Sequence, residues 1–244
     1  MLTQNTIVIT GGSSGIGLEL ARKLIAQKNT VIICGRSEQK LADAAHQIPW
    51  LVTYTCDISD PDACRRFYKW IEDNYPACNM LINNAAIAHT ADFLKDDNAI
   101  EKATEEFQTN ILAPIRLTKL FAPLLLKNNR SMLINISTGL VYAPKASYPF
   151  YNATKAALHS FTQTLRMQTS KSPLQIIEVL LPVVDTPWHK GPVPKTAITA
   201  LQATEKILAG IQKGKTEIRI AKVALLYWIA RLSPSLAIKI INRL

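Results

Sequence analysis

A glycine-rich loop between a predicted strand and a predicted helix constrains the fold of this chain most strongly. Ile7 to Thr10 is a short run of β-branched residues, and the sequence Thr-Gly-Gly-Ser-Ser-Gly-Ile-Gly follows from Thr10 to Gly17. A helical pattern begins at once, with apolar residues at Leu18, Ala21 and Leu24. A strand, a glycine loop and a helix in this order are typical of a loop that binds the pyrophosphate of a dinucleotide at the helix N-terminus.

The glycines of this loop have separate predicted roles. Gly11 permits the tight turn, Gly15 lets backbone amides approach the pyrophosphate, and Gly17 lets the helix pack closely on the strand. We expect the following loop residues to contact the dinucleotide: Gly11, Ser13, Ser14, Gly15, Ile16 and Gly17. The alternative is an ordinary βα turn that is rich in glycine.

The end of the next strand bears on which dinucleotide fits. Thr30 to Cys34 closes a βαβ unit and is followed by Gly35 and Arg36. An acidic residue here would bind the ribose 2′-hydroxyl, whereas an arginine accommodates a 2′-phosphate. Arg36 therefore favours NADP over NAD, although Glu38 lies close in sequence and Arg36 could also be a solvated loop charge.

Strand and helix patterns alternate along all 244 residues. Further strands are predicted near Leu51–Thr55, Met80–Ile82, Met132–Ile136, Gln175–Leu181 and Glu217–Ile220, with helices between them. This alternation predicts an α/β fold with a doubly wound parallel sheet of the Rossmann type. Since 48% of the residues are hydrophobic and no linker or repeat is evident, we expect a single domain, 1–244, in which 221–244 forms a C-terminal helical tail.

Small and polar residues follow several of these strands, where doubly wound sheets bind ligands. We expect the following to contact the dinucleotide: Asp57, Ile58, Asn84, Ala85, Pro182, Val184 and Thr186. Each has a plainer explanation as well. Asp57 could cap the next helix with Ser59 and Asp60, and Asn83 and Asn84 could form an Asx-type turn.

Tyr151 and Lys155 are four residues apart in a segment that reads as a helix, with Ser147 as a cap and Pro149 in its first turn. They therefore share one helix face. A free tyrosine titrates near ~10, and a fixed cation that lowered this pKa by ~3 units would correspond to about 4 kcal/mol. Such a tyrosine could exchange a proton with an alkoxide or alcohol. The same spacing also arises by chance on helix surfaces.

Two further features lie between the strand ends and Tyr151. Pro114 falls inside a predicted helix from Glu101 to Lys127, and it cannot bond to the carbonyl of Asn110, which is then free to hold a water. Ser137 and Thr138 end a central strand, where either hydroxyl could donate to a substrate oxygen or simply cap a turn.

Together these motifs resemble the short-chain dehydrogenase/reductase family over nearly the whole chain. The residues that carry the resemblance are Thr10-Gly-x-x-x-Gly-x-Gly17, Asn83-Asn-Ala85, Asn110, Ser137-Thr138 and Tyr151-x-x-x-Lys155. The sequence from Ser137 to Pro144 looks more like the bacterial oxidoreductases associated with D-alanylation of teichoic acids.

The resemblance implies roles for the matching residues. Tyr151 would be the general acid/base, and Lys155 would lower its pKa and bind the nicotinamide ribose. Ser137 or Thr138 would orient the substrate oxygen, and the Asn110 carbonyl would hold a relay water. The position that the catalytic serine of the family usually occupies, counted back from the tyrosine, corresponds to Thr138 in this chain. Ala86 and Val183 stand where the family commonly has glycine, which adds bulk beside the cofactor.

The composition limits other functions. The net charge is +10, but the basic residues are spread along the chain, so we expect no nucleic-acid partner. The four cysteines and four histidines lack metal-ligand spacing, so no metal site is predicted. Reduced thiols and the absence of room for a signal peptide before the first strand suggest a cytoplasmic protein.

The C-terminal residues are the least decisive part of the sequence. Val223 to Ala230 is apolar but far shorter than the ~20 residues that span a bilayer, and Pro234 then interrupts it. An amphipathic helix follows, with Leu236, Ile240 and Leu244 on one face. We expect it to pack on a neighbouring subunit, and contact with a membrane surface is the alternative. By resemblance, the helices near 101–127 and 149–170 would form a homodimer.

The sequence as a whole predicts an NADP-preferring oxidoreductase that moves hydride between the nicotinamide and a carbonyl or alcohol substrate. Tyr142, Tyr148 and Phe150 could line an apolar substrate pocket or belong to the core. Two rivals remain: a dinucleotide-binding regulator without turnover, and a membrane-surface protein that acts through its tail.

Overall fold

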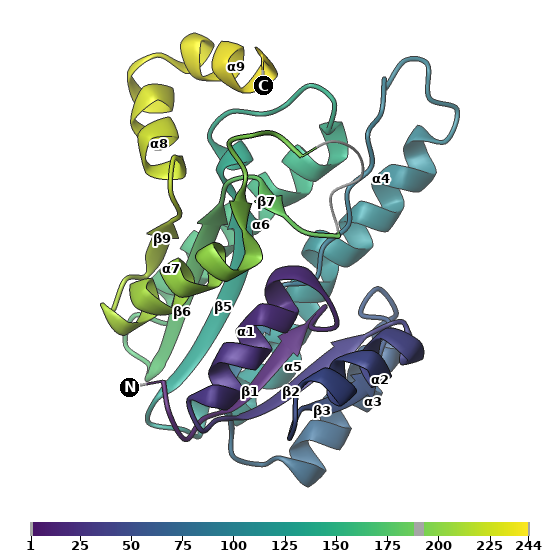
Figure 1. Cartoon of the computed structure of the whole chain (residues 1–244), viewed down its shortest axis with the longest axis vertical. Helices are drawn as coiled ribbons and strands as arrows, with labels where there is room; N and C mark the ends of the chain where they lie inside the picture. The colour runs from purple at the N-terminus through teal and green to yellow at the C-terminus, as the bar shows by residue number, and fades with distance from the viewer. Residues whose placement is uncertain (1, 188–192, 244) are drawn as a thin grey trace.

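The computed structural model describes residues 2–187 and 193–243, in which strands and helices alternate along the chain (Figure 1). The principal sheet is built from β1 (Thr6–Thr10), β2 (Thr30–Gly35), β3 (Val52–Thr55), β4 (Cys78–Asn83), β5 (Ser131–Thr138), β6 (Leu174–Leu181) and β9 (Glu217–Arg219). Their order is β3-β2-β1-β4-β5-β6-β9, and every pairing within it is parallel. This confirms the predicted doubly wound class.

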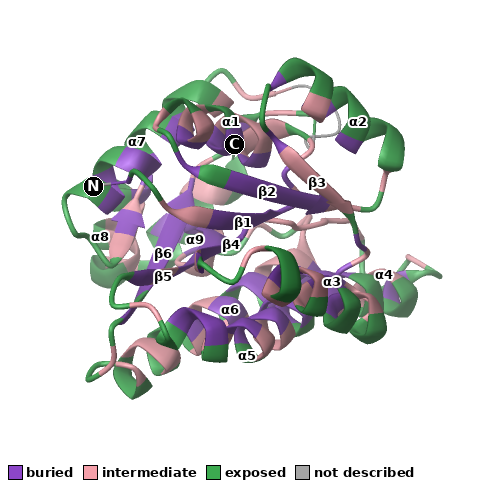
Figure 2. Ribbon diagram, turned by 90° about the horizontal axis from the view of Figure 1, so that it is seen from below, coloured by how far each residue is buried: buried purple, intermediate pink, exposed green. Residues whose placement is uncertain are grey.

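Helices cover both faces of the sheet (Figure 2). One face carries α1 (Gly15–Ala26), α2 (Glu38–Gln47) and α7 (Ala200–Gln212). The other carries α3 (Pro61–Asn74), α4 (Ala99–Phe107), α5 (Ala113–Leu126) and α6 (Pro149–Gln168). The parallel strands are therefore buried on both sides, which explains their nearly continuous apolar sequences.

The alternation of side chains along β1 shows how the core divides into two layers. Ile7 and Ile9 pack with residues of α1, α2 and α7, whereas Val8 points the other way, toward Phe67 of α3 and Phe121 of α5. All five side chains are fully buried. Because successive strand residues face opposite sides, one short strand contributes to both layers.

Local capping sets the starts of several helices. Asp60 caps α3 by accepting a bond from the Asp62 amide at 2.8 Å, so this helix begins at Pro61. Thr199 and Gln202 form a capping box, so α7 begins at Ala200. The prediction that Ser147 caps α6 was wrong, since Tyr148 occupies that position without a side-chain bond.

The predicted helix from Glu101 to Lys127 is divided into α4, a π-helical turn η1 (Gln108–Leu112) and α5. Pro114 lies in the first turn of α5, where its missing N–H is tolerated, so the irregularity is a π-bulge rather than a proline kink. The whole segment, 28 residues, has the length and hydropathy of a membrane span, but half of its most apolar window is buried in the fold. It is the central helix of the face opposite α1.

After β6 the chain forms a small strand pair, β7 (Val184–Asp185) with β8 (Ile198–Thr199), that the sequence did not predict. For Trp188 and His189 the sequence suggests an exposed loop, with contact to the substrate as the alternative, and both residues lie outside the described part of the chain. Beyond β9, the tail forms α8 (Val223–Leu232) and α9 (Pro234–Arg243), drawn in yellow beyond one end of the sheet in Figure 1.

Candidate active site

The carboxyl ends of the parallel strands open into a cavity of about 700 Å³. Its volume is in the usual range for small-molecule and cofactor sites. Most of the predicted site residues line it: Gly11, Ser13, Ser14, Gly15, Ile16, Arg36, Asp57, Ile58, Asn84, Ala85, Ser137, Thr138, Tyr151, Lys155, Pro182, Val184 and Thr186. The sheet thus brings residues from both ends of the sequence to one edge, as its topology requires.

The glycine loop is held by the ends of β1 and β4. Gly11 has a φ of +63° and Gly15 a φ of +55°, a region that favours glycine. The Thr10 hydroxyl accepts bonds from the amides of Asn84 at 3.0 Å and Ala85 at 3.1 Å. The Asn84 side chain donates to the Thr10 carbonyl at 2.9 Å. Asn84 therefore shapes the loop from the neighbouring strand.

Gly17 does not line the cavity, and its role is close packing. A Cβ there would lie 2.6 Å from both the Asn84 side-chain nitrogen and the Gly11 carbonyl oxygen. At Gly15 a Cβ would meet Thr186 at 3.3 Å, across the cavity entrance. The loop therefore leaves a concave backbone surface at the start of α1, which suits an anionic pyrophosphate.

Two cations line the cavity beyond β2. Arg36 follows the strand, and Lys40 lies one turn into α2. Glu38 is the acidic residue close in sequence that argued against an NADP preference. It is exposed and is not among the residues that line the cavity. The sequence analysis did not single out Lys40. Lys40 is four residues after Arg36, which would place both side chains on one face only if the helix already included Arg36; α2 begins at Glu38.

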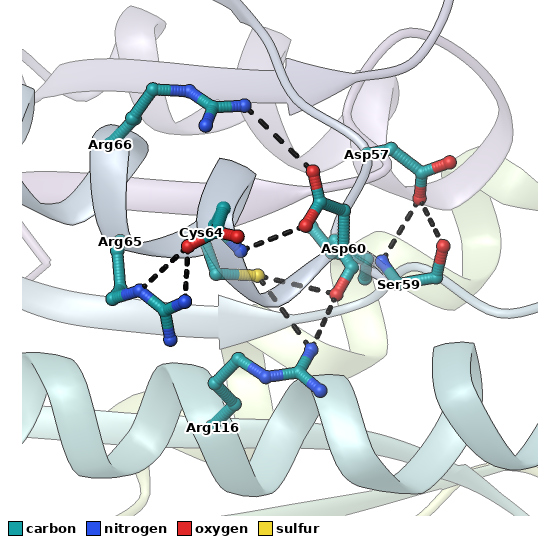
Figure 3. Close-up of polar contacts among 9 residues, drawn as sticks. Asp57, Ser59, Asp60, Cys64, Arg65, Arg66 and Arg116 are labelled. Atoms are coloured by element: carbon teal, nitrogen blue, oxygen red, sulfur yellow. Dashed lines mark hydrogen bonds and ion pairs between the residues drawn. The ribbon is translucent and has the colours of Figure 1, made fainter.

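Asp57 lines the cavity and also stabilises the turn after β3 (Figure 3). Its carboxylate accepts bonds from the Ser59 amide at 2.9 Å and the Ser59 hydroxyl at 2.7 Å. Next to it, the Ile58 carbonyl accepts a 3.0 Å bond from Arg116 of α5 and a 3.2 Å bond from the Cys64 thiol. These bonds fix the backbone of Asp57 and Ile58 at the cavity wall.

Tyr151 and Lys155 lie side by side on α6, as their spacing predicted. The Lys155 ammonium donates to the Ile136 carbonyl at 2.8 Å and lies 5.8 Å from the centre of the Tyr151 ring. Lys155 is buried, while Tyr151 is half-buried at the cavity wall. Burial lowers the pKa of Lys155 to about 8, against the opposing effect of the Glu178 and Glu106 carboxylates.

The expected direction of the Tyr151 pKa shift was wrong. Burial and the nearby Glu106 carboxylate raise the pKa of Tyr151 above its ordinary value, and a hydrogen bond with Thr138 only partly offsets this. The main physical reason is burial, which disfavours the charged phenolate. The Lys155 ammonium donates to the Ile136 carbonyl, and its charge does not overcome the effect of burial on the Tyr151 pKa.

The structure separates the two hydroxyls at the end of β5. Thr138 shares a hydrogen bond with Tyr151, and its hydroxyl also accepts from the Leu140 amide at 3.3 Å. Ser137 is buried, and its hydroxyl has no hydrogen-bond partner among the described residues. Thr138 is thus the hydroxyl next to the phenol, in the register that the resemblance indicated.

Asn110 lies behind the cavity wall, fully buried in the π turn. Its side chain accepts from the Ile87 amide at 2.9 Å and donates to the Ile87 carbonyl at 2.8 Å. It also donates to the Thr154 hydroxyl at 3.2 Å. Asn110 therefore joins the segment after β4 to α6, one residue from Lys155.

The sequence did not indicate that the tail forms part of this cavity. The residues of the tail that line it are Ala221, Lys222, Val223, Leu225, Leu226, Ile229, Ile240 and Ile241. Of the three aromatics considered earlier, only Tyr148 lines the cavity. Tyr142 instead donates to Glu217 at 2.6 Å, and Phe150 is buried against Phe93. The apolar residues of the tail were visible in the sequence, but their packing partner was not.

The chain matches the short chain dehydrogenase family over residues 5–196. It is 40% identical over 227 residues to the uncharacterized oxidoreductase DltE of Bacillus subtilis, covering 91% of this chain and 90% of that protein. The chain belongs to the short-chain dehydrogenase/reductase family. The similarity to DltE also confirms the closer resemblance. Short-chain dehydrogenases are NAD(P)-dependent oxidoreductases, so the chain is assigned to that class of enzyme.

Solved structures of other short-chain dehydrogenases share this fold. One from Burkholderia cenocepacia, in complex with NADP, superposes with a TM-score of 0.88 at 22% identity, covering 99% of this chain and 98% of its own. One from Burkholderia phymatum, in complex with NAD, has a TM-score of 0.80 at 18% identity, covering 95% of each chain. Relatives of this fold thus bind either nicotinamide dinucleotide.

Proposed function

We propose that this short-chain dehydrogenase is an NADP-preferring oxidoreductase that interconverts a carbonyl and an alcohol, with Tyr151 as the general acid/base. The observation that carries the proposal is the grouping of Thr138, Tyr151 and Lys155 in the cavity that also contains the glycine loop. The concave backbone at Gly15 and the cations at Arg36 and Lys40 fit a phosphorylated dinucleotide.

In this proposal each protein group acts on the substrate oxygen or on the bound dinucleotide. The reduced nicotinamide supplies the hydride when the cofactor is bound. The Thr138 hydroxyl donates to the substrate carbonyl oxygen, and Tyr151 gives that oxygen its proton as the alcohol forms. Lys155 binds the nicotinamide ribose, and the anionic cofactor favours its ammonium form. The Asn110 side chain holds the backbone at Ile87 and bonds to Thr154, next to Lys155. In this proposal the Asn110 carbonyl binds a water that passes a proton back to Tyr151.

The preference for NADP rests on Arg36 and Lys40. Arg36 and Lys40 would hold a dianionic 2′-phosphate through charge-assisted bonds that the 2′-hydroxyl of NAD would not form. We expect tighter binding of NADPH than of NADH, and we expect Arg36→Ala to lose at least about tenfold in NADPH affinity with little effect on NADH. Arg22→Ala, in an exposed position on α1, is the control. Equal affinities in the parent protein would contradict this preference.

The substrate that fits the cavity has an apolar body. Apolar residues that line the cavity include Leu140, Leu226, Ile229 and Ile241. Desolvation of a hydrocarbon chain against them would supply binding energy without any polar recognition. We therefore propose an aldehyde, ketone or alcohol that carries an aliphatic or alicyclic group.

The decisive experiment measures oxidation of NADPH with a panel of such carbonyl compounds. Loss of the general acid in Tyr151→Phe should lower kcat by about 10²–10⁴-fold, while the NADPH dissociation constant stays within about twofold. Activity retained in Tyr151→Phe would reject the assigned role. NADPH binding without turnover of any carbonyl in the parent protein would instead favour the regulator.

We also propose a cytoplasmic homodimer. The buried, unpaired state of Cys34, Cys56, Cys64 and Cys78 supports a reducing compartment. Large apolar side chains are exposed on α4, η1 and α6, namely Phe107, Leu112 and Met167. Their exposure supports a dimer in which two copies of the chain pack through these helices. Light scattering should give the mass of two chains, and Met167→Glu should lower it toward one.

A further inference from the structure

The inner side of the C-terminal tail has its packing partner within the same chain. Leu226 and Ile229 of α8 and Ile240 and Ile241 of α9 line the cavity. Asn242 fixes α9 to the loop before α6, since it accepts from the Ala146 amide at 2.7 Å and donates to the Pro144 carbonyl at 2.9 Å. A neighbouring subunit is therefore not needed to cover this side.

The outer side of α8 remains exposed and is strongly apolar. Trp228 is 61% exposed and Leu232 is 85% exposed, and Leu225 is also 61% exposed although it contributes to the cavity lining. The three residues recur at helical spacing and so form one stripe. On α9, Leu236 and Ile238 are also exposed, but they lie on different faces of that helix. We call Leu225, Trp228 and Leu232 the tail surface. Exposed apolar side chains that share one helix face often mark an interaction site.

The charge around the tail surface has one sign. Residues 221–244 contain Lys222, Arg231, Lys239 and Arg243 and no acidic residue. All four basic side chains are exposed. A second copy of the chain would bring the same patch against itself across a two-fold axis, so that cation would face cation. An anionic lipid surface complements both the apolar stripe and the charge.

We propose that α8 and α9 dock this protein on an anionic lipid surface through the tail surface. Neither helix is long enough to cross a bilayer, since each has ten residues. Helices of this kind lie in the headgroup region, with apolar side chains inserted and basic side chains at the phosphates. The two helices also line the cavity, so docking places its substrate end beside the lipid. The proposal goes beyond the redox reaction and does not require it.

The test is co-sedimentation of the full chain with vesicles. Vesicles of phosphatidylcholine and phosphatidylglycerol in equal parts are compared with vesicles of phosphatidylcholine alone. We expect binding to the mixed vesicles that weakens as salt is added. Trp228→Ser with Leu232→Ser should lower the partition coefficient by about tenfold or more. Arg231→Glu with Lys239→Glu should lower it by about thirtyfold or more.

Matched controls come from the opposite, amino edge of the sheet. Trp50 and Leu126 are exposed apolar residues there, and Lys127 and Arg130 are exposed basic residues. Trp50→Ser with Leu126→Ser, and Lys127→Glu with Arg130→Glu, make the same chemical changes and should leave binding within about twofold. Binding of NADPH and the molar mass in solution are measured for every variant, so folding and redox function are followed independently.

Three results would overturn the proposal. One is a parent protein that fails to sediment with the mixed vesicles. Another is an equal loss of vesicle binding in the tail variants and in their controls. The third combines two observations: the parent protein does not bind vesicles, and the Trp228→Ser, Leu232→Ser variant has a lower molar mass than the parent. This result would assign the tail surface to contact between copies of the chain.

Discussion

Lys155 links the protonation of the site to cofactor binding. Burial lowers its pKa to about 8, so the ammonium form loses its proton as the pH rises through that value. An anionic dinucleotide favours the ammonium form, and its binding should therefore take up a proton near and above pH 8. We expect the NADPH affinity to be nearly constant below about pH 8 and to fall above it, by up to about tenfold per pH unit.

Isothermal titration in buffers of different ionisation enthalpy measures this proton uptake directly. Lys155→Met keeps the length of the side chain but cannot titrate, so its NADPH affinity should be lower and should lack the decline above pH 8. The same slope in Lys155→Met would assign the proton to another group, for example Cys64, whose pKa is lowered by bonds from Cys56 and Arg116.

Thr138 and Ser137 offer a clean comparison of two adjacent hydroxyls. Thr138 bonds with Tyr151, whereas Ser137 is buried without a partner. Thr138→Ala should lower kcat by about tenfold or more, because it removes the donor to the substrate oxygen. Thr138→Ser keeps the hydroxyl and should restore most of the activity.

Ser137→Ala is the matched control and should change kcat by less than about threefold. A larger loss in Ser137→Ala than in Thr138→Ala would exchange the roles of the two hydroxyls. Steady-state kinetics with one carbonyl compound and saturating NADPH is sufficient for this comparison.

Single residues could be predicted where local backbone geometry determines their type. Gly11 and Gly15 adopt left-handed backbone conformations, and the glycine pattern alone predicted this loop. The pKa of Tyr151 could not be predicted, because it depends on where the Lys155 ammonium points and on a buried carboxylate 45 positions away, at Glu106. Such distances in sequence leave no local pattern.

At the scale of elements, the π turn at Gln108–Leu112 illustrates what periodicity misses. An apolar stripe predicts a helix, but one inserted residue rotates that stripe by about 100°, and Phe107 is exposed while Glu106 is buried. The Asn110 side chain in this turn bonds with the backbone amide and carbonyl of Ile87. Strands and longer helices were predicted well because each buries a regular pattern, whereas the short β7–β8 pair has only two residues in each strand.

Asn110 should therefore be essential to stability as well as to the site. Asn110→Ala leaves the partly buried amide and carbonyl of Ile87 without these bonds, which should lower the free energy of unfolding by about 1–3 kcal/mol. Urea denaturation followed by circular dichroism measures this change. Asn74→Ala removes one exposed bond to the Trp70 carbonyl and should cost less than about 1 kcal/mol. Similar losses of unfolding free energy in both variants would contradict the view that Asn110 stabilises the segment at Ile87.

The whole molecule combines a fold that the sequence predicts with a cavity that it does not. The order of the strands follows from the βαβ units and brings the glycine loop, Thr138 and Tyr151 to one edge. The position of the tail depends on contacts between α9 and the loop at Pro144 and Ala146, nearly a hundred residues earlier. Amphipathicity predicts that such a helix buries one face, but not which surface covers that face.

This closure of the cavity by the tail predicts how the size of the substrate is limited. Ile241 of α9 lines the cavity, so a larger side chain there would occupy part of the cavity volume. Ile241→Trp should raise the KM for a long-chain aldehyde by about tenfold relative to a short-chain aldehyde, because only the longer chain needs that space. The dissociation constant for NADPH should stay within about twofold. Leu126→Trp, in an exposed position at the amino edge of the sheet, is the control and should leave the ratio of the two KM values unchanged. An equal rise for both aldehydes, or a loss of NADPH binding, would show that the tail does not form the substrate end of the cavity.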